Sequence, residues 1–156
     1  MGLKEELGLS KPFATVGHEA LLNIYFTSTC IKKRGTEFLR PYGLTDVQFN
    51  LMLLIEHQGG EDEGLSQARL SEMMLVNRAN ITSLIDRMEK GKFVIRTAKY
   101  ADRRYNIIKL TKHGKKLLEK VEPLYGREVK RVIGALSANE QKRLIKMLEK
   151  VRVTLG

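Results

Sequence analysis

The sequence predicts a mainly α-helical protein with a small β-hairpin wing, a winged helix-turn-helix with flanking helices. Apolar residues recur at helical spacing along most of the 156 residues. Two short segments rich in β-branched residues, "FVIRTAK" (93–99) and "YNIIKLT" (105–111), are separated by "YADRR", which is typical of a two-stranded hairpin. Three helices precede this hairpin closely, which is the order of elements in a winged helix.

The N-terminal part of the chain predicts an arm followed by a long helix. Residues 1–14 contain two glycines and a proline, and we expect a flexible arm there. Residues 15–40 place apolar side chains on several sides of a helix, which "RPYGLT" ends with its proline and glycine. A helix with so many apolar sides needs more than one neighbour to cover it.

Capping signals place the next two helices. Thr45 and Gln48 have the spacing of a capping box at the start of a helix over 45–58. After the acidic, glycine-rich loop "GGEDEG", Ser66 is expected to cap a short helix. Together these helices supply the first half of the winged helix.

The segment 77–90 predicts an amphipathic helix that begins at Asn77 as its N-cap. Its apolar residues have the spacing i, i+3, i+4, i+7 of a single buried stripe: Ile81, Leu84, Ile85 and Met88. Polar and basic side chains occupy the opposite face. The helix can therefore bury one side in a core and present the other to a partner.

Two long helices are expected after the hairpin. Thr111 is placed to cap the first, and Ser137 with Glu140 forms a capping box at the start of the second. The apolar residues of the last helix follow one seam: Leu144, Leu148, Val151 and Leu155. A small winged-helix core cannot cover these flanking helices, so we expect them to pack against a second copy of the chain.

The positive charge of the chain is concentrated in one block. The net charge is +10 and the pI is about 9.8. Between Arg87 and Lys116 there are eleven Lys and Arg against two Asp and Glu, whereas the rest of the chain has 17 against 16. A solvated helix face usually mixes both signs. The block therefore favours an anionic partner, most simply nucleic acid.

Three stretches stand in a familiar order over about half the chain: "LTDVQFNLMLLI" (44–55), "ARLSEMMLVNRANITSLIDRMEKGKFVIR" (68–96) and "ADRRYNIIKLTKHG" (101–114). Together they resemble the DNA-binding half of the MarR family, the multiple-antibiotic-resistance regulators. The resemblance implies a homodimeric transcription regulator, more often a repressor, which binds double-stranded DNA at a near-palindromic operator. It divides the chain into an arm (1–14), a helical dimerisation region (15–43 and 111–156) and a winged helix-turn-helix DNA-binding domain (44–110).

Polar residues of the predicted helix-turn-helix and hairpin are the candidate DNA contacts. Asn and Arg pair with adenine and guanine edges, while Thr, Ser and Lys suit phosphates. The same side chains could form the solvated face of an amphipathic helix, and Ser66 could be a plain cap. The candidates are Ser66, Gln67, Arg78, Asn80, Thr82, Ser83, Arg87, Lys99, Arg103 and Arg104.

The hairpin tip carries one acidic residue among its cations. Asp102 and Arg104 match the "D.R" positions of the family, and an arginine can enter a narrow, negative minor groove. Arg103 adds a second cation for the DNA backbone. A carboxylate beside DNA is unfavourable unless it organises the arginines, so Asp102 is expected to brace the wing. Which arginine it braces stays open.

Other side chains are candidates for sensing. A small aromatic or lipophilic effector could bind in a cleft lined by Tyr25, Phe26, Phe49 and Tyr125, although packing in the core accounts for each of them more simply. The single cysteine, Cys30, is expected to be a small buried residue rather than an oxidant sensor.

Several function classes are not supported. The chain has no phosphate loop, no "G.S.G" elbow and no acid–base pair at useful spacing, so we expect no enzyme and no cofactor. Three scattered histidines favour no metal site. No apolar run approaches bilayer length, and "MGLKEELGLSKPF" lacks the apolar core of a signal peptide, so a cytoplasmic protein without a membrane partner is expected. The alternatives are a winged-helix protein-interaction module and an effector-independent, non-specific nucleic-acid binder.

Overall fold

The computed structural model describes residues 2–74, 78–98 and 106–155 of the chain. Its elements are α1 (Leu3–Glu6), α2 (Val16–Leu39), η1 (Arg40–Tyr42), α3 (Asp46–Gln58), η2 (Gly60–Asp62), β1 (Gly64–Ser66), α4 (Gln67–Met73), α5 (Arg78–Lys90), β2 (Val94–Ala98), β3 (Asn106–Leu110), α6 (Lys112–Ile133) and α7 (Ala138–Val153). The predicted class, a mainly helical protein with a small β-wing, is confirmed.

The wing contains one strand more than the sequence predicts. The sheet is antiparallel in the order β1-β3-β2, and β1 pairs Leu65 with Ile108. Residue 64 is a glycine because its backbone lies against the side chain of Ile107 and the carbonyl of Ile108, where a Cβ would collide. A strand of three residues that begins with glycine carries no periodic signal in the sequence.

Polar N-caps begin five of the described helices, and the sequence predicts four of these caps: Thr45, Ser66, Thr111 and Ser137. A hydroxyl accepts a hydrogen bond from the backbone N–H three residues later at five N-caps: Thr15, Thr45, Ser66, Thr111 and Ser137. At the start of α7, Ser137 also donates from its hydroxyl and its backbone N–H to the carboxylate of Glu140, which lowers the pKa of that carboxyl. The expected N-cap Asn77 lies outside the described residues.

One core holds the winged helix together. The stripe predicted on α5 is fully buried, with Ile81, Ile85 and Met88 at 0% exposure and Leu84 at 4%. The other elements of the winged helix and the first half of α6 bury their apolar residues against it: Leu51, Met52, Ile55, Leu70, Val94, Ile108, Leu118 and Val121. Burial of this size fixes α5 relative to the wing, because large core side chains interdigitate.

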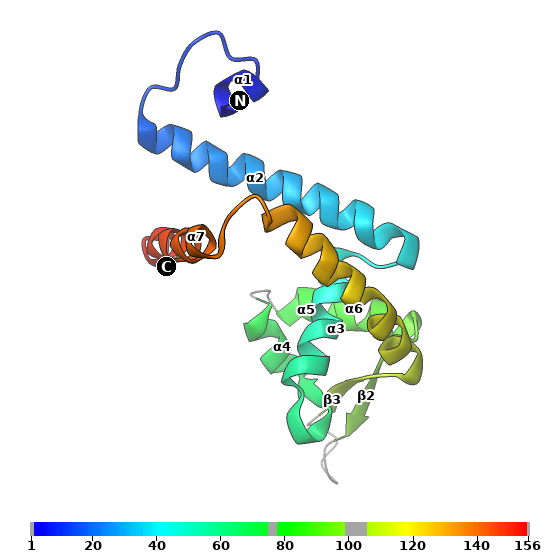
Figure 1. The fold of residues 1–156 in the computed structure, drawn as a ribbon. Helices are drawn as coiled ribbons and strands as arrows, with labels where there is room; N and C mark the ends of the chain where they lie inside the picture. The colour runs from blue at the N-terminus through cyan, green and yellow to red at the C-terminus, as the bar shows by residue number, and fades with distance from the viewer. Residues whose placement is uncertain (1, 75–77, 99–105, 156) are drawn as a thin grey trace.

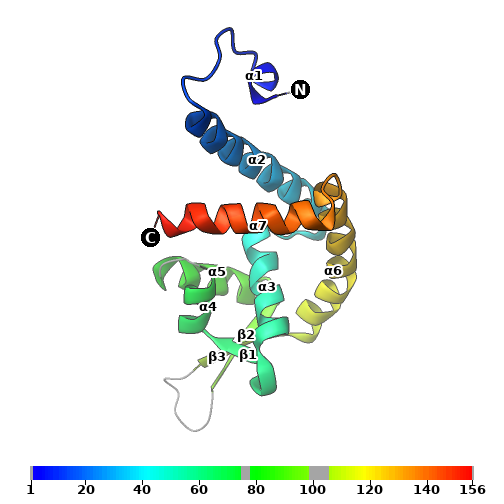
Figure 2. The ribbon, with the colours of Figure 1, turned by 60° about the vertical axis from the view of Figure 1, so that its left-hand side comes forward.

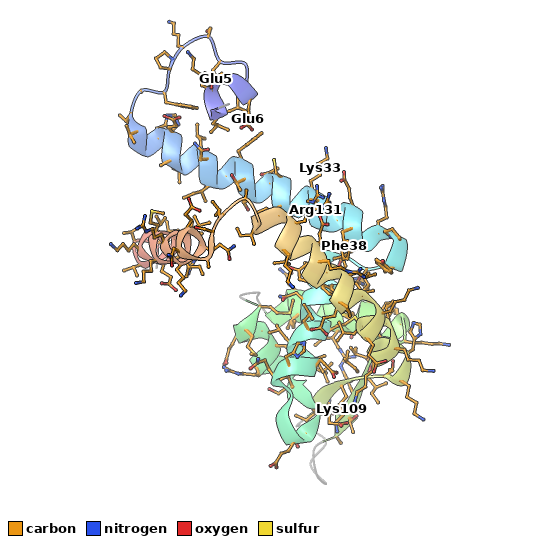
Figure 3. All side chains as sticks on the ribbon, in the orientation of Figure 1. Glu5, Glu6, Lys33, Phe38, Lys109 and Arg131 are labelled. Atoms are coloured by element: carbon orange, nitrogen blue, oxygen red, sulfur yellow. The ribbon has the colours of Figure 1, made fainter. Side chains whose placement is uncertain are left out.

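The flanking helices extend away from this core. Figures 1 and 2 show α2 running past the winged helix and α7 crossing between them, while α6 rises from the wing to α2. Phe38 lies where α2 and α6 meet (Figure 3), and its ring centroid is 6.1 Å from that of Tyr125. None of the described helices combines the length and apolarity needed to span a membrane.

The expected burial of Cys30 is wrong for this chain, because Cys30 is exposed on α2. Among the described residues of α2, Leu39 at the C-terminal end is the one that is fully buried. The rest of α2 extends beyond the winged-helix core. No neighbouring element of the described chain therefore covers Cys30.

Candidate nucleic-acid interface

Helices α4 and α5 form the helix-turn-helix pair at one side of the winged helix (Figure 1). Leu70 of α4 is fully buried against the stripe of α5. The hydroxyl of Ser66 caps α4 by accepting from the backbone N–H of Arg69 at 3.2 Å. The amide of Gln67 donates to the hydroxyl of Thr82 on α5, with nitrogen and oxygen 2.5 Å apart. Ser66, Gln67 and Thr82 thus each have a hydrogen-bond partner within the protein.

A separate row of polar side chains lies on the outer face of α5. Asn80, Ser83 and Arg87 are exposed and have the spacing i, i+3, i+7, so they lie along one line of the helix surface. This line lies to one side of the buried stripe, roughly a third of a turn around the helix. Arg78 begins the same helix, and its side chain lies outside what the structure describes. The row places an amide, a hydroxyl and a guanidinium side by side, which suits contacts to base edges and phosphates.

The wing stands beside this helix, and its tip lies outside the described residues. The tip includes four predicted site residues: Lys99, Asp102, Arg103 and Arg104. The described base of the wing is held firmly at α6. The carbonyl of Phe93 accepts from the backbone N–H of Thr111 at 3.0 Å, and the Thr111 hydroxyl donates to the carbonyl of Lys92 at 2.6 Å. The wing therefore leaves the core from a fixed base.

Arg96 on β2 joins the wing to α5 through two carboxylates. Its guanidinium contacts Asp86 at 2.6 Å and also binds Glu89, and its backbone N–H donates to Glu89 at 3.0 Å. Sequence reasoning did not identify these residues. The available signal was the pair of carboxylates three positions apart on α5, followed by a single arginine in the next strand.

An apolar cavity of about 740 Å³ lies between the winged helix and the flanking helices. Phe49 and Tyr125 line it, with ring centroids 5.0 Å apart, as do residues of α2, α6 and α7. Tyr25 and Phe26 are not among its lining residues, and Tyr25 is 66% exposed. The structure thus brings together two of the four residues predicted for an effector cleft.

Two side-chain contacts tie α6 to α2 and to α3. Arg34 of α2 binds Glu128 of α6, and both residues line the cavity. His57 of α3 lies 2.6 Å from the carboxylate of Glu122. Within the described ranges, no group of three His, Cys, Asp or Glu side chains could hold a metal ion.

Part of the chain matches a known protein family and several transcriptional regulators. Residues 42–104 match the MarR family. The HTH-type transcriptional regulator SarZ of Staphylococcus epidermidis is 35% identical over 91 residues, which are 58% of this chain and 59% of SarZ. The match therefore spans about three fifths of the length of that relative.

Two solved structures share the fold over nearly the whole chain. AbsC, a MarR family transcriptional regulator from Streptomyces coelicolor, has a TM-score of 0.81 at 22% identity and covers 93% of this chain and 98% of its own. A mutant MarR from E. coli, complexed with operator DNA, has a TM-score of 0.75 at 22% identity and covers 97% and 99%. At this identity the likeness shows the winged-helix fold with its flanking helices.

Proposed function

Since this chain is a MarR-family winged-helix protein, we propose that it is a DNA-binding transcription regulator that acts as a homodimeric repressor. The observation that carries the proposal is the exposed row Asn80, Ser83 and Arg87 on α5, because this row leads directly into the most basic block of the chain, which begins at Arg87. Helix α5 would enter the major groove, and the wing would reach the neighbouring minor groove. Two such helices in a dimer would meet a near-palindrome with half-sites roughly 34–36 Å apart.

The homodimer is supported by the apolar residues that the single chain leaves uncovered. On α2 and α7 they include Leu21, Ile24, Ile31, Ile145, Met147 and Val151. Helices with exposed apolar faces of this extent are stabilised when a partner covers them. Sedimentation that shows monomer alone at micromolar concentration would remove this part of the proposal.

An effector would bind in the cavity between the winged helix and the flanking helices. The cavity is lined mainly by apolar side chains and includes the Phe49–Tyr125 ring contact, which fits a small aromatic or lipophilic molecule. Such a ligand would change the spacing of the two winged helices by favouring one arrangement of the dimer. A thermal-shift screen with small aromatic acids is the direct test, since a ligand that binds the folded state raises the melting temperature.

The DNA-binding proposal is tested by fluorescence anisotropy with a labelled duplex from upstream of the protein's own gene and a scrambled duplex. Binding should be tighter to the first duplex and should weaken steeply between about 50 and 200 mM salt, because phosphate contacts release counterions. Equal affinity for both duplexes would instead identify a non-specific nucleic-acid binder. A protein that binds neither duplex would be an interaction module.

The tip of the wing has its own test. Arg104→Ala should weaken binding to the upstream duplex while the dimer and the melting temperature stay unchanged, because an arginine in a narrow minor groove contributes to DNA binding and not to folding. Unchanged binding would show that Arg104 does not enter the groove.

A further inference from the structure

The wing and α5 are joined by a cluster of three charged side chains at the C-terminal half of α5. Arg96, whose side chain is 25% exposed, binds Asp86 and Glu89 at once through two nitrogens of its guanidinium. Its backbone N–H also donates to Glu89. One residue of the wing therefore makes three bonds to two successive turns of α5.

We propose that Arg96 is a positioning residue for DNA binding: it clamps the wing to α5, so that the two reading elements meet DNA as one rigid unit. The proposal deepens the proposed function and rests on it, because it presumes that α5 and the wing both contact DNA. Arg96 acts through Asp86 and Glu89 and does not itself touch DNA.

The position of β2 in the sheet explains why a clamp is needed. In the order β1-β3-β2, β2 lies at the edge, and β3 is its one neighbour in the described sheet. The N–H of Arg96 is directed away from β3, so Glu89 supplies the acceptor that a further strand would otherwise provide. The backbone N–H of Phe93, which donates to the carbonyl of Met88 at 2.9 Å, ties the start of β2 to the end of α5, and the Arg96 cluster adds directed bonds farther along the strand.

The charges of the cluster also bear on DNA. Asp86 precedes Arg87 directly and follows Ser83 by three positions, so its carboxylate borders the exposed row of α5. Its side chain is 51% exposed. An anionic side chain there would repel the DNA phosphates, and the guanidinium of Arg96 offsets this repulsion at a distance of 2.6 Å.

Arginine suits this role in a way that lysine does not. A planar guanidinium presents several N–H groups in a fixed fork and can bind two carboxylates with defined directions, whereas an ammonium group is a single charged point on a flexible stem. Arg96→Lys should therefore retain the charge and lose part of the orientation.

The experiment is a double-mutant cycle read by anisotropy with the upstream duplex. Arg96→Gln should weaken binding about tenfold in the natural protein, and by less than about threefold in the Asp86→Asn, Glu89→Gln background, where the clamp is already absent. The affinity of the Arg96→Lys variant for the upstream duplex should lie between that of the natural protein and that of Arg96→Gln. Lys11→Gln in the N-terminal arm, which removes the same charge far from the cluster in sequence, should leave the affinity unchanged.

A second readout separates positioning from general folding. Hydroxyl-radical footprinting of the Arg96→Gln complex should lose protection of the sugars in the flanking minor grooves, where the wing would bind, while guanine N7 atoms in the major groove stay protected from methylation by dimethyl sulfate. Equal losses in both backgrounds of the cycle would show that Arg96 contacts DNA directly, and no loss in either would show that it has no role. A uniform loss of the footprint would likewise overturn the clamp. If the natural protein binds no duplex, the proposed DNA-binding function is wrong, and the positioning role of Arg96 is rejected with it.

Discussion

The side-chain amide of Gln67 donates a hydrogen bond to the hydroxyl of Thr82, and the two atoms are 2.5 Å apart. Gln67 is the first residue of α4, and Thr82 lies in the second turn of α5. Both residues are candidates for DNA contact from the sequence. Their bond helps to fix the angle between the two helices of the helix-turn-helix. It also means that both side chains have a hydrogen-bond partner within the protein.

Thr82→Val should lower the stability of the fold. Valine keeps the shape of threonine but removes the hydroxyl, which leaves the Gln67 amide without this acceptor and costs about 1 kcal/mol. Chemical denaturation followed by circular dichroism measures the change. Ser83→Ala is the matched control, because the neighbouring hydroxyl is exposed and alanine is a better helix former, so the free energy of unfolding should not fall. Equal destabilisation by the two variants would contradict the assignment.

Arg87→Ala should weaken DNA binding and leave the stability of the fold unchanged. Its side chain is exposed in the row Asn80, Ser83 and Arg87, so its loss should barely change the melting temperature. A direct contact to DNA is worth about 1–3 kcal/mol, so the affinity for the upstream duplex should fall about fivefold or more. Anisotropy at two salt concentrations distinguishes a phosphate contact, which reduces the salt slope, from a base contact, which reduces discrimination against the scrambled duplex. Unchanged affinity would remove Arg87 from the interface.

The fold was largely predictable because its signals are local. The stripe Ile81, Leu84, Ile85 and Met88 and the caps at Thr45 and Ser137 depend on residues a few positions apart, and each is found where the sequence predicts it. Strand β1 was missed because its partner, β3, is more than 40 residues away and its own three residues carry no period.

The candidate site was less predictable, because it depends on contacts between elements. The pairing of Arg96 with Asp86 and Glu89 joins a strand to a helix, and periodicity within either element does not reveal it. Cys30 and Tyr25 were expected to be covered within the protein, and both are exposed in the single chain. The apolar pattern of α2 indicates that the helix needs neighbours, but not that the single chain leaves this part of the helix uncovered.

Ile85→Ala should unfold the winged helix at much lower denaturant concentration. Ile85 is fully buried in the core between α5 and its neighbours, and removing a buried isoleucine side chain to alanine costs about 2–5 kcal/mol. The measurement is the midpoint of guanidinium unfolding, with the slope as a check on two-state behaviour. A loss below about 1 kcal/mol would show that this face of α5 is not in a packed core.

Gly114→Ala should destabilise the junction between the wing and α6. A Cβ at position 114 would collide with the carbonyl oxygen of Phe93, the same oxygen that accepts from the backbone N–H of Thr111. The helix start must then move away from the wing base, at a cost of about 1–3 kcal/mol. Gly126→Ala in the same helix is the control. A Cβ at position 126 would meet no described atom within 4 Å outside its own helix backbone, so alanine should stabilise α6 by about 0.5–1 kcal/mol. The two variants should therefore shift the melting temperature in opposite directions.

Val151→Glu tests the homodimer on the apolar seam of α7. Val151 is 39% exposed in the single chain, so a carboxylate there is tolerated by the monomer but would be buried and unpaired if a second copy covered the seam. Sedimentation should shift from dimer to monomer, and the affinity for the upstream duplex should fall as the second winged helix is lost. The neighbouring Lys150→Glu is the control, because it adds the same carboxylate about 100° around the helix, on the polar side. If Val151→Glu remains dimeric, or if Lys150→Glu dissociates equally, the seam of α7 is not the surface that joins the two copies.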